Sequence, residues 1–171
     1  KGGDFNKTLA LLHRAAEQWP GKISTHLMVG LGETDRELIA RLQEMAHNHI
    51  RVGLFAFTPV KGTGLQHHLP PPLARYRRIQ AAYHLIFRCG IQARDFSFDG
   101  QGNLVSLGQP PQRLAAILCG GEAFRTTGCA LCNRPYYNER PGGDIYNYPR
   151  PLSPAEADAA LQLLPTTGSG R

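Results

Sequence analysis

The fold is decided by residues 23–45, which read ISTHLMVGLGETDRELIARLQEM. The apolar run that starts at Ile23 is typical of a short buried strand, and the two glycines after Val29 predict the turn that leaves it. Thr34 and Glu37 then form a capping box, because the hydroxyl and the carboxylate can satisfy free backbone N–H groups reciprocally. The stretch therefore predicts a strand, a tight turn and a helix.

The same alternation continues on both sides of this stretch. The sequence predicts a helix over 6–18, a strand over 52–57, a long loop over 58–72, a helix over 73–88, a strand over 93–98, a turn over 99–103, a strand over 104–107 and a helix over 111–118. Strands that alternate with helices in this way predict a parallel α/β sheet. A complete eightfold barrel needs about 250 residues. We therefore expect either a small open sheet or the back half of a barrel.

The character of the chain changes after residue 118. Gly, Pro, Asn, Arg and Tyr dominate residues 119–150. Such a segment buries too little apolar surface to order itself cheaply, so it needs a staple or a partner surface. Ser153 then opens a last helix with a second capping box, and we expect the final residues, 166–171, to be disordered. We divide the chain into 1–118, 119–150 and 151–171.

Length and composition exclude several classes of protein. The chain has 171 residues, of which 42% are hydrophobic, and a net charge of +6 from 19 Lys and Arg against 13 Asp and Glu. A chain of this size can bury a core without metal or disulfide staples. No apolar run approaches the roughly 18 residues that span a bilayer, and no secretory leader is readable, so we expect a cytoplasmic location. The only methionines are Met28 and Met45, so we expect that residue 1 is not the natural start.

The densest group of basic residues lies on the predicted helix over 73–88. It consists of Arg75, Arg77, Arg78 and Arg88. Because charged residues usually oppose the buried stripe of a helix, we expect these arginines to form a solvated outer face. We expect Cys89, at the end of the same helix, to belong to the core.

The turn after the first strand is a candidate ligand site, because α/β folds bind ligands at the carboxyl ends of their strands. Gly30 would let a flat ligand approach the backbone, and Glu33 can order the loop through its own hydrogen bonds. A tight turn without a ligand is the alternative. At the end of the next strand, Phe55 and Phe57 would wall a pocket or pack in the core, and His26 is a candidate pocket residue.

Three of the four cysteines lie close together in the sequence, at Cys119, Cys129 and Cys132. Two thiolates three positions apart in a tight turn can both reach one metal ion or cluster, so Cys129 and Cys132 are candidate ligands. Cys119 is a candidate third ligand. The spacing alone leaves zinc, an iron–sulfur cluster, a redox dithiol and chance as alternatives.

The motifs together resemble a known superfamily. Gly30-Leu31-Gly32-Glu33-Thr34, followed by a helix, a strand and the run VKGTGL at 60–65, resembles the carboxyl-terminal half of biotin-synthase-like radical S-adenosylmethionine enzymes. This resemblance covers roughly residues 1–118. The tail, with FRTTGC at 124–129, NRPYYNERPGG at 133–143 and YNYPR at 146–150, is similar to that of a subgroup that includes the two-protein lipoyl synthases.

The resemblance implies an α/β fold, namely the carboxyl-terminal half of a partial TIM-type barrel followed by an irregular, cysteine-containing extension. The family's adenine-contacting motif, Gly-x-Ile-x-Gly-x-x-Glu, falls on His26, Met28, Gly30 and Glu33, of which the first two depart from it. Together with Phe57, the last three are the implied S-adenosylmethionine-binding residues. The family's Cys-x-x-x-Cys-x-x-Cys loop, which holds the catalytic 4Fe–4S cluster, is absent from this sequence. The resemblance therefore implies no catalytic residue here and a fragment that is inactive alone.

The resemblance also implies cofactors, partners and a reaction. Cys129 and Cys132, with Cys119, would bind an auxiliary iron–sulfur cluster, the sulfur source for insertion into unactivated C–H bonds. S-adenosylmethionine and a small-molecule, acyl-carrier or lipoyl-domain substrate would be the partners, with a second radical S-adenosylmethionine protein as a further one. No membrane is implied, and nucleic acid is not expected.

A different class of protein accounts for the same tail. In this alternative the cysteine pair holds zinc in a small RNA-binding module, where arginines meet phosphate and tyrosines stack on bases. The residues concerned are Arg125, Arg134, Arg140 and Arg150, with Tyr136, Tyr137, Tyr146 and Tyr148. A third possibility is a structural zinc on an inactive barrel fragment.

Overall fold

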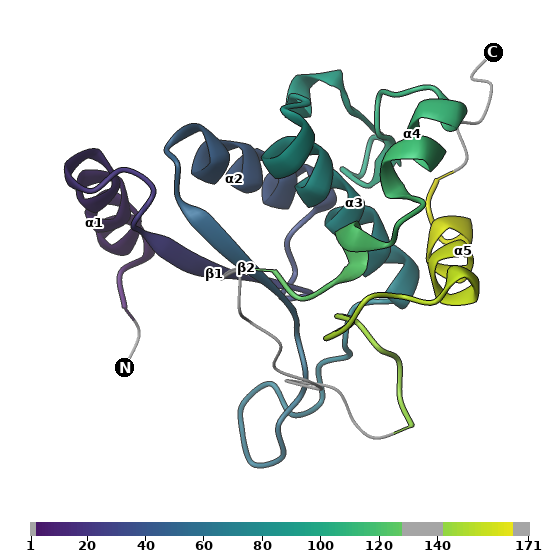
Figure 1. Ribbon diagram of the computed structural model, residues 1–171. Helices are drawn as coiled ribbons and strands as arrows, with labels where there is room; N and C mark the ends of the chain where they lie inside the picture. The colour runs from purple at the N-terminus through teal and green to yellow at the C-terminus, as the bar shows by residue number, and fades with distance from the viewer. Residues whose placement is uncertain (1–2, 128–141, 166–171) are drawn as a thin grey trace.

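The computed structural model describes residues 3–127 and 142–165, and within them the protein is a mixed α/β fold (Figure 1). The elements are α1 (Phe5–Gln18), β1 (Ser24–Val29), α2 (Asp35–His47), β2 (Arg51–Ala56), α3 (Leu73–Cys89), η1 (Ala93–Asp95), β3 (Ser97–Phe98), β4 (Leu104–Ser106), α4 (Pro111–Leu118), η2 (Glu122–Phe124) and α5 (Pro154–Gln162). Neither of the two small sheets in the described ranges is closed into a barrel. No described helix has both the length and the apolar character needed to cross a bilayer.

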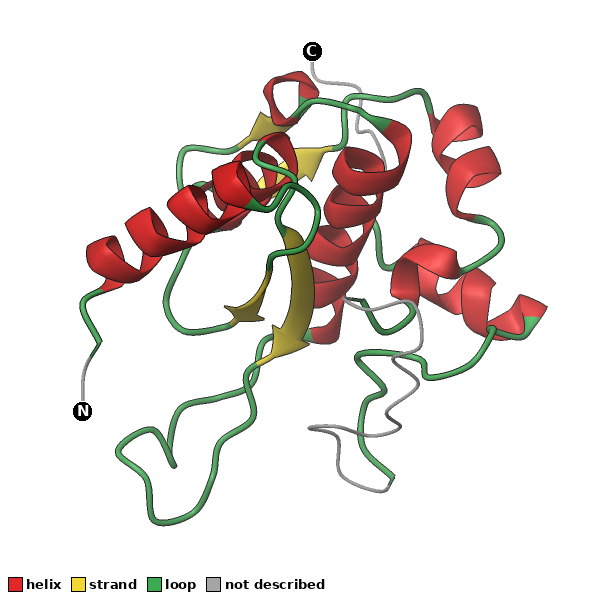
Figure 2. Cartoon of the chain, turned by 60° about the vertical axis from the view of Figure 1, so that its left-hand side comes forward, coloured by secondary structure: helices red, strands yellow, loops and turns green. Residues whose placement is uncertain are grey.

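The first sheet is the parallel pair that the sequence predicts. β1 and β2 run side by side in register, with Ser24 opposite Arg51 and Val29 opposite Ala56. The capping box at Thr34 starts α2 as predicted, and α2 packs against α3. Alternate residues of β1 face the core, with Val29 buried and Thr25 and Leu27 partly buried. Residues of β2 that share their face, such as Leu54, belong to the same core as both helices. The helices therefore gather on one face of the pair (Figure 2).

The outer edge of β2, on the side away from β1, is occupied by side chains. The hydroxyl groups of Tyr83 and Tyr76 donate hydrogen bonds to the carbonyl oxygens of Val52 and Leu54 at 3.1 and 3.0 Å. The N–H of Leu54 donates to Thr127 Oγ1 at 2.7 Å. Burial raises the pKa of Tyr83, so its hydroxyl keeps the proton that it donates. These contacts take up three of the outward backbone groups to which another strand would pair.

The predicted third strand over 93–98 is wrong for half of its length. Residues 93–95 form the 3₁₀ helix η1, and only Ser97–Phe98 is extended. This short β3 pairs antiparallel with β4 and forms a separate sheet. The cause is local polar chemistry: the Asp95 carboxylate accepts the Gln92 N–H, and Asp99 accepts the N–H groups of Gln101 and Asn103. The turn over 99–103 is thus confirmed, whereas the third parallel strand is not.

The solvated arginine face predicted for α3 is wrong for Arg77 and confirmed for Arg88, which is exposed, while Arg75 and Arg78 are half-buried. Arg77 is only 2% exposed, and its guanidinium donates to the backbone oxygens of Tyr146 and Ile145 at 2.6 and 2.5 Å. The rings of Phe124 and Tyr148 lie 5.4 and 5.3 Å from its central carbon. The described part of the irregular segment thus has the partner surface that it needs, which is α3.

Two further expectations concern the ends of helices. Cys89 is exposed rather than part of the core, because it is the last residue of α3 and lies beyond the buried stripe. The helix predicted from Ser153 is confirmed as α5, with its capping box to Glu156. The final residues, 166–171, which we expect to be disordered, lie outside the described residues.

Candidate functional site

The Glu33 carboxylate fixes the backbone of the turn that follows β1. Glu33 accepts the N–H groups of Gly30 and Leu31 at 2.8 Å each, one on each carboxylate oxygen. Gly30 has a backbone φ of 104°, which residues with a side chain rarely adopt. A Cβ at this position would lie 2.8 Å from Pro71 Cδ. Both features require glycine at this position. Glu33 therefore orders the turn through its own hydrogen bonds, as the sequence predicts.

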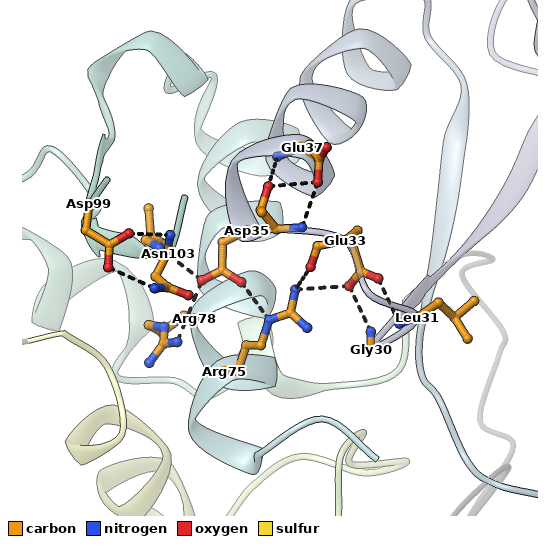
Figure 3. A network of polar contacts seen from close by, with 11 residues as sticks. Gly30, Leu31, Glu33, Asp35, Glu37, Arg75, Arg78, Asp99 and Asn103 are labelled. Carbon is orange, nitrogen blue, oxygen red and sulfur yellow. Dashed lines mark hydrogen bonds and ion pairs between the residues drawn. The ribbon is translucent and has the colours of Figure 1, made fainter. Parts of the chain in front are cut away.

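Arg75 connects this turn to the buried core (Figure 3). Its Nη2 donates to the backbone oxygen and Oε1 of Glu33 at 2.6 and 3.0 Å, and its Nε donates to Asp35 Oδ1 at 2.8 Å. Asp35 is fully buried and also accepts the N–H of Leu104 at 3.0 Å. Arg78 lies 3.7 Å from the same carboxylate. The Glu33 carboxylate is consequently used within the protein and serves to shape the turn.

Beside the turn, the face of the parallel pair opposite the helices carries aromatic and sulfur side chains. Met28 points to this face and is 42% exposed. His26 meets Phe55 edge to face, with ring centroids 5.1 Å apart. Gly53 makes room for the imidazole, since a Cβ there would lie 2.7 Å from His26 Cδ2. We call the face formed by His26, Met28, Gly53 and Phe55 the open face.

The loop over 58–72 closes on the turn through a contact that the sequence analysis missed. His68 Nε2 lies 2.8 Å from the backbone oxygen of Gly30. Its ring packs edge to face on Phe57, at 5.2 Å between centroids. Phe57 is itself buried, so it supports His68 more than it lines the open face. The only sequence signal for this contact was a histidine in a long loop, which does not identify the backbone oxygen that it meets.

The structure brings together four of the seven predicted site residues. Met28, Gly30, Glu33 and Phe57 surround the carboxyl ends of β1 and β2. Cys119 directly follows α4 and is exposed, and its thiol donates to Ala116 O at 3.4 Å. Cys129 and Cys132 lie outside the described residues. Within the ranges 3–127 and 142–165, no group of three or more His, Cys, Asp and Glu side chains is placed to hold a metal ion.

The described residues of the alternative RNA-binding interpretation all contact other residues of the chain, the two arginines in ion pairs at the surface. Arg125 pairs with Glu122 at 3.1 Å, and Arg150 pairs with Glu156 through two bonds of 2.9 and 2.8 Å. Tyr146 is buried and donates its hydroxyl to Pro71 O at 2.7 Å, and the Tyr148 ring lies against Arg77. The remaining four, Arg134, Arg140, Tyr136 and Tyr137, lie outside the described residues.

No protein-family model, curated protein or solved structure gives a significant match to this sequence.

Proposed function

We propose that this chain is the carboxyl-terminal part of a radical S-adenosylmethionine enzyme that inserts sulfur into unactivated C–H bonds. Residues 1–118 would be half of its TIM-type barrel. The turn at Gly30 and Glu33, with the exposed Met28 beside it, would receive the adenosine part of S-adenosylmethionine. Cys129 and Cys132, with Cys119, would hold an auxiliary iron–sulfur cluster.

The observation that carries the proposal is the braced glycine turn at the carboxyl end of a parallel strand pair. Ligands of α/β folds bind at this end of the strands. The positive φ of Gly30 and the two N–H bonds to Glu33 hold the backbone in one conformation without a ligand. A preformed turn of this kind suits a flat ligand, because less conformational freedom is lost on binding.

The arrangement of the helices supports the barrel part of the proposal. α1 contacts α2 through His13 and Glu44, whose side chains lie 3.0 Å apart, and α2 packs on α3. All three helices therefore share one core on one side of the strands. In a barrel the helices lie outside, and the opposite side chains of the strands point inward. The open face would accordingly be part of the barrel interior.

The described residues on either side of the 128–141 gap support the cysteine part. Thr127, directly before the gap, is bonded to Leu54 in the middle of β2. Tyr146, shortly after it, is held by Arg77 and Gln80 of α3. The described residues that flank the gap, Thr127 and Tyr146, thus lie beside β2 and α3. Thiolates are the ligands that iron–sulfur clusters prefer.

Each residue would have a limited role. Glu33 would keep the turn in shape, Met28 would supply apolar contact, and Phe57 would act by supporting His68. S-adenosylmethionine with the 4Fe–4S cluster would supply the hydrogen-abstracting chemistry, and the auxiliary cluster would supply sulfur. The ligands of the 4Fe–4S cluster are not in this sequence, so no step of the reaction is assigned to a residue here.

The first experiment reads the coding sequence upstream of residue 1. The proposal requires a Cys-x-x-x-Cys-x-x-Cys loop in a strand–helix unit there, and its absence would overturn the proposal. The full polypeptide is then reconstituted anaerobically with iron and sulfide. Visible iron–sulfur absorbance that falls when Cys129 and Cys132 are both changed to Ala supports the auxiliary cluster. A colourless zinc protein whose RNA affinity falls with salt would favour the alternative function, and zinc without RNA affinity would favour a structural metal.

The nucleoside site has its own test in the same polypeptide. Binding of S-adenosylmethionine is measured by calorimetry for Met28→Glu and for Val105→Glu. Val105, on β4, is the matched control because its exposure of 44% is close to that of Met28. We expect Met28→Glu to weaken binding by roughly 10-fold or more, since it buries a charge against the ligand, and Val105→Glu to leave binding unchanged. Equal affinities in the two variants would contradict the site.

A further inference from the structure

Pro71 is the residue at which the long loop after β2 packs on the turn that follows β1. Residues 61–70 are all exposed, whereas Pro71 is buried. A Cβ built on Gly30 would lie 2.8 Å from Pro71 Cδ and 3.2 Å from its Cβ and Cγ, so the proline ring covers the Cα of Gly30. The N–H and C=O groups of Gly30 contact Glu33 and His68. The proline ring therefore adds a third contact to the two that hold this glycine.

The position of Pro71 is fixed in turn by Tyr146. The Tyr146 hydroxyl donates a buried hydrogen bond to the backbone oxygen of Pro71 at 2.7 Å. Proline has a fixed φ, and Pro71 lies between two further prolines, so the backbone here has little freedom to absorb a displacement. A shift of the Pro71 carbonyl group would accordingly move the ring that contacts Gly30.

Tyr146 is itself fixed on α3. Its backbone oxygen accepts hydrogen bonds from Arg77 Nη1 at 2.6 Å and from Gln80 Nε2 at 3.0 Å. Its ring packs edge to face on that of Tyr76, with ring centroids 5.1 Å apart. Tyr146 lies 75 positions after Pro71 in the sequence. One hydroxyl thus connects the turn after β1 to a distant segment that is held by α3.

We propose that Tyr146 is a positioning residue for the turn over 30–33, and that it acts through Pro71 on Gly30. Its role in binding rests on the proposed function, in which this turn receives the adenosine part of S-adenosylmethionine. A ligand that needs one conformation of the turn binds more weakly when that conformation is only partly populated. The packing of Tyr146 on α3 would therefore set the affinity of a site at the end of β1.

The binding test compares two buried tyrosine hydroxyls in the full polypeptide. Tyr146→Phe removes the donor to Pro71 O and keeps the ring that packs on Tyr76. Tyr83→Phe is the matched control, because it removes the donor to Val52 O on the outer edge of β2. Both variants should lower the urea midpoint to a similar extent, since each takes one donor from a buried carbonyl oxygen. Calorimetry should show S-adenosylmethionine binding roughly 5-fold weaker in Tyr146→Phe and unchanged in Tyr83→Phe.

Hydrogen exchange of the turn provides a readout that needs no ligand. It is measured on the same polypeptide without S-adenosylmethionine. The amides of Gly30 and Leu31, which bond to Glu33, should be protected in the wild type. In Tyr146→Phe they should exchange at least roughly 5-fold faster, because a surface turn opens locally rather than with the whole protein. In Tyr83→Phe they should exchange as in the wild type.

Pro71→Ala tests the same connection from its other end. The change removes the ring that contacts Gly30 and keeps the carbonyl oxygen that accepts from Tyr146. It should speed the exchange of Gly30 and weaken S-adenosylmethionine binding, as Tyr146→Phe does. Pro70→Ala is the matched control, since Pro70 is the exposed neighbour and its loss gives the unfolded chain a similar gain in freedom. If Tyr146→Phe does not fold, the two proline variants decide between the outcomes.

Two results would overturn the proposal. The first is equal exchange of Gly30 in Tyr146→Phe and Tyr83→Phe, which would make the Tyr146 hydroxyl a general contribution to stability. The second is faster exchange in Tyr146→Phe with unchanged affinity for S-adenosylmethionine, which would make the contact purely structural. If the wild type does not bind S-adenosylmethionine, the proposed function fails, and the exchange rates alone decide whether Tyr146 positions the turn.

Discussion

The two outer edges of the β1–β2 pair show how differently one small sheet can end. Along β2, the hydroxyl groups of Tyr76 and Tyr83 and the Oγ1 of Thr127 bond to three outward backbone groups, the carbonyl oxygens of Val52 and Leu54 and the N–H of Leu54. Along β1, the outward groups of residues 24, 26 and 28 have no partner in the described structure. Side-chain hydroxyls can therefore satisfy the backbone groups at the edge of a sheet where a helix lies beside that edge. An edge without such a helix keeps its backbone groups available to another strand.

The outer edge of β2 depends on segments that lie far apart in the sequence. α3 supplies the tyrosines, and the described residues 145–147 pack beside them on the same helix through Arg77 and Gln80. Stability should accordingly be concentrated on the β2 side. Four predictions test this comparison, from the largest expected effect to the smallest.

The largest effect is expected from Arg77→Met. The change leaves the backbone oxygen of Ile145 without the Arg77 donor and that of Tyr146 with only its bond from Gln80. Hydrogen bonds to a charged group contribute about 1.5–3 kcal/mol each, so we expect a loss of about 3 kcal/mol in the free energy of unfolding in urea. Arg88→Met on the exposed end of α3 is the control and should cost less than about 0.5 kcal/mol. Equal losses in the two variants would show that the stability is not concentrated on the β2 side.

The second effect concerns the turn that ends β1. Gly30→Ala forces a side chain into a left-handed conformation and against Pro71. We expect a loss of about 2 kcal/mol by the same measurement. Gly64→Ala is the matched control in the neighbouring loop, since a Cβ there meets no atom within 4 Å. A neutral Gly30→Ala would show that the turn is not held as tightly as its hydrogen bonds indicate.

The third prediction compares the two edges one hydroxyl at a time. Tyr76→Phe and Tyr83→Phe each remove a donor to a β2 carbonyl oxygen. Each should cost about 1 kcal/mol, because a buried acceptor is left unpaired. Ser24→Ala on the β1 edge should be close to neutral, since the Ser24 side chain is exposed. If all three substitutions had the same effect, the contrast between the edges would not be energetic.

The smallest effect is expected when acid protonates Glu156 in α5. Hydrogen bonds from Arg150 and from the backbone and hydroxyl of Ser153 lower the pKa of Glu156 from 4.5 to about 2. A lowered carboxylate pKa stabilises the folded state above the ordinary value, and this contribution is lost as pH falls through the lower one. Between pH 4.5 and 2, the amides of α5 should therefore lose protection.

The β2 edge provides the comparison for this titration. Tyrosine hydroxyls do not titrate in acid, so the amides of Val52 and Leu54 should keep their protection until the protein unfolds globally. Arg150→Gln should raise the pKa of Glu156 as followed by NMR. An unchanged pKa in that variant would contradict the assigned cause.

Much of the β1–α2 region was predictable from sequence because its causes are local. The capping box at Thr34 and Glu37 uses residues three positions apart, and the Thr34 hydrogen bonds also lower the pKa of Glu37. Gly30 and Glu33 are equally close, so the turn and its bracing carboxylate were both expected. The same reasoning placed β1, β2 and the long loop after β2 correctly.

The misses share a physical cause, which is dependence on distant segments. Arg77 was expected in solvent because a helix normally has one covered face, whereas α3 is covered by strands on one side and by the tail on another. His68 was not expected to meet Gly30, which lies 38 positions away. The strand predicted over 93–98 failed for a different reason, because a local hydrogen bond from the Gln92 N–H to the Asp95 carboxylate favours a turn over an extended backbone.

The sequence by itself determined the elements whose signals lie within one or two turns of the chain: the helices, the parallel strand pattern, the caps and the glycine turn. Only the tertiary structure decided which polar groups are buried and which edges are finished. Burial and edge pairing depend on what packs against a residue, and the energies involved are those of backbone groups that must find a partner. The outward N–H and C=O groups of β1 and β2 are chemically alike, and only the neighbouring α3 and tail distinguish them.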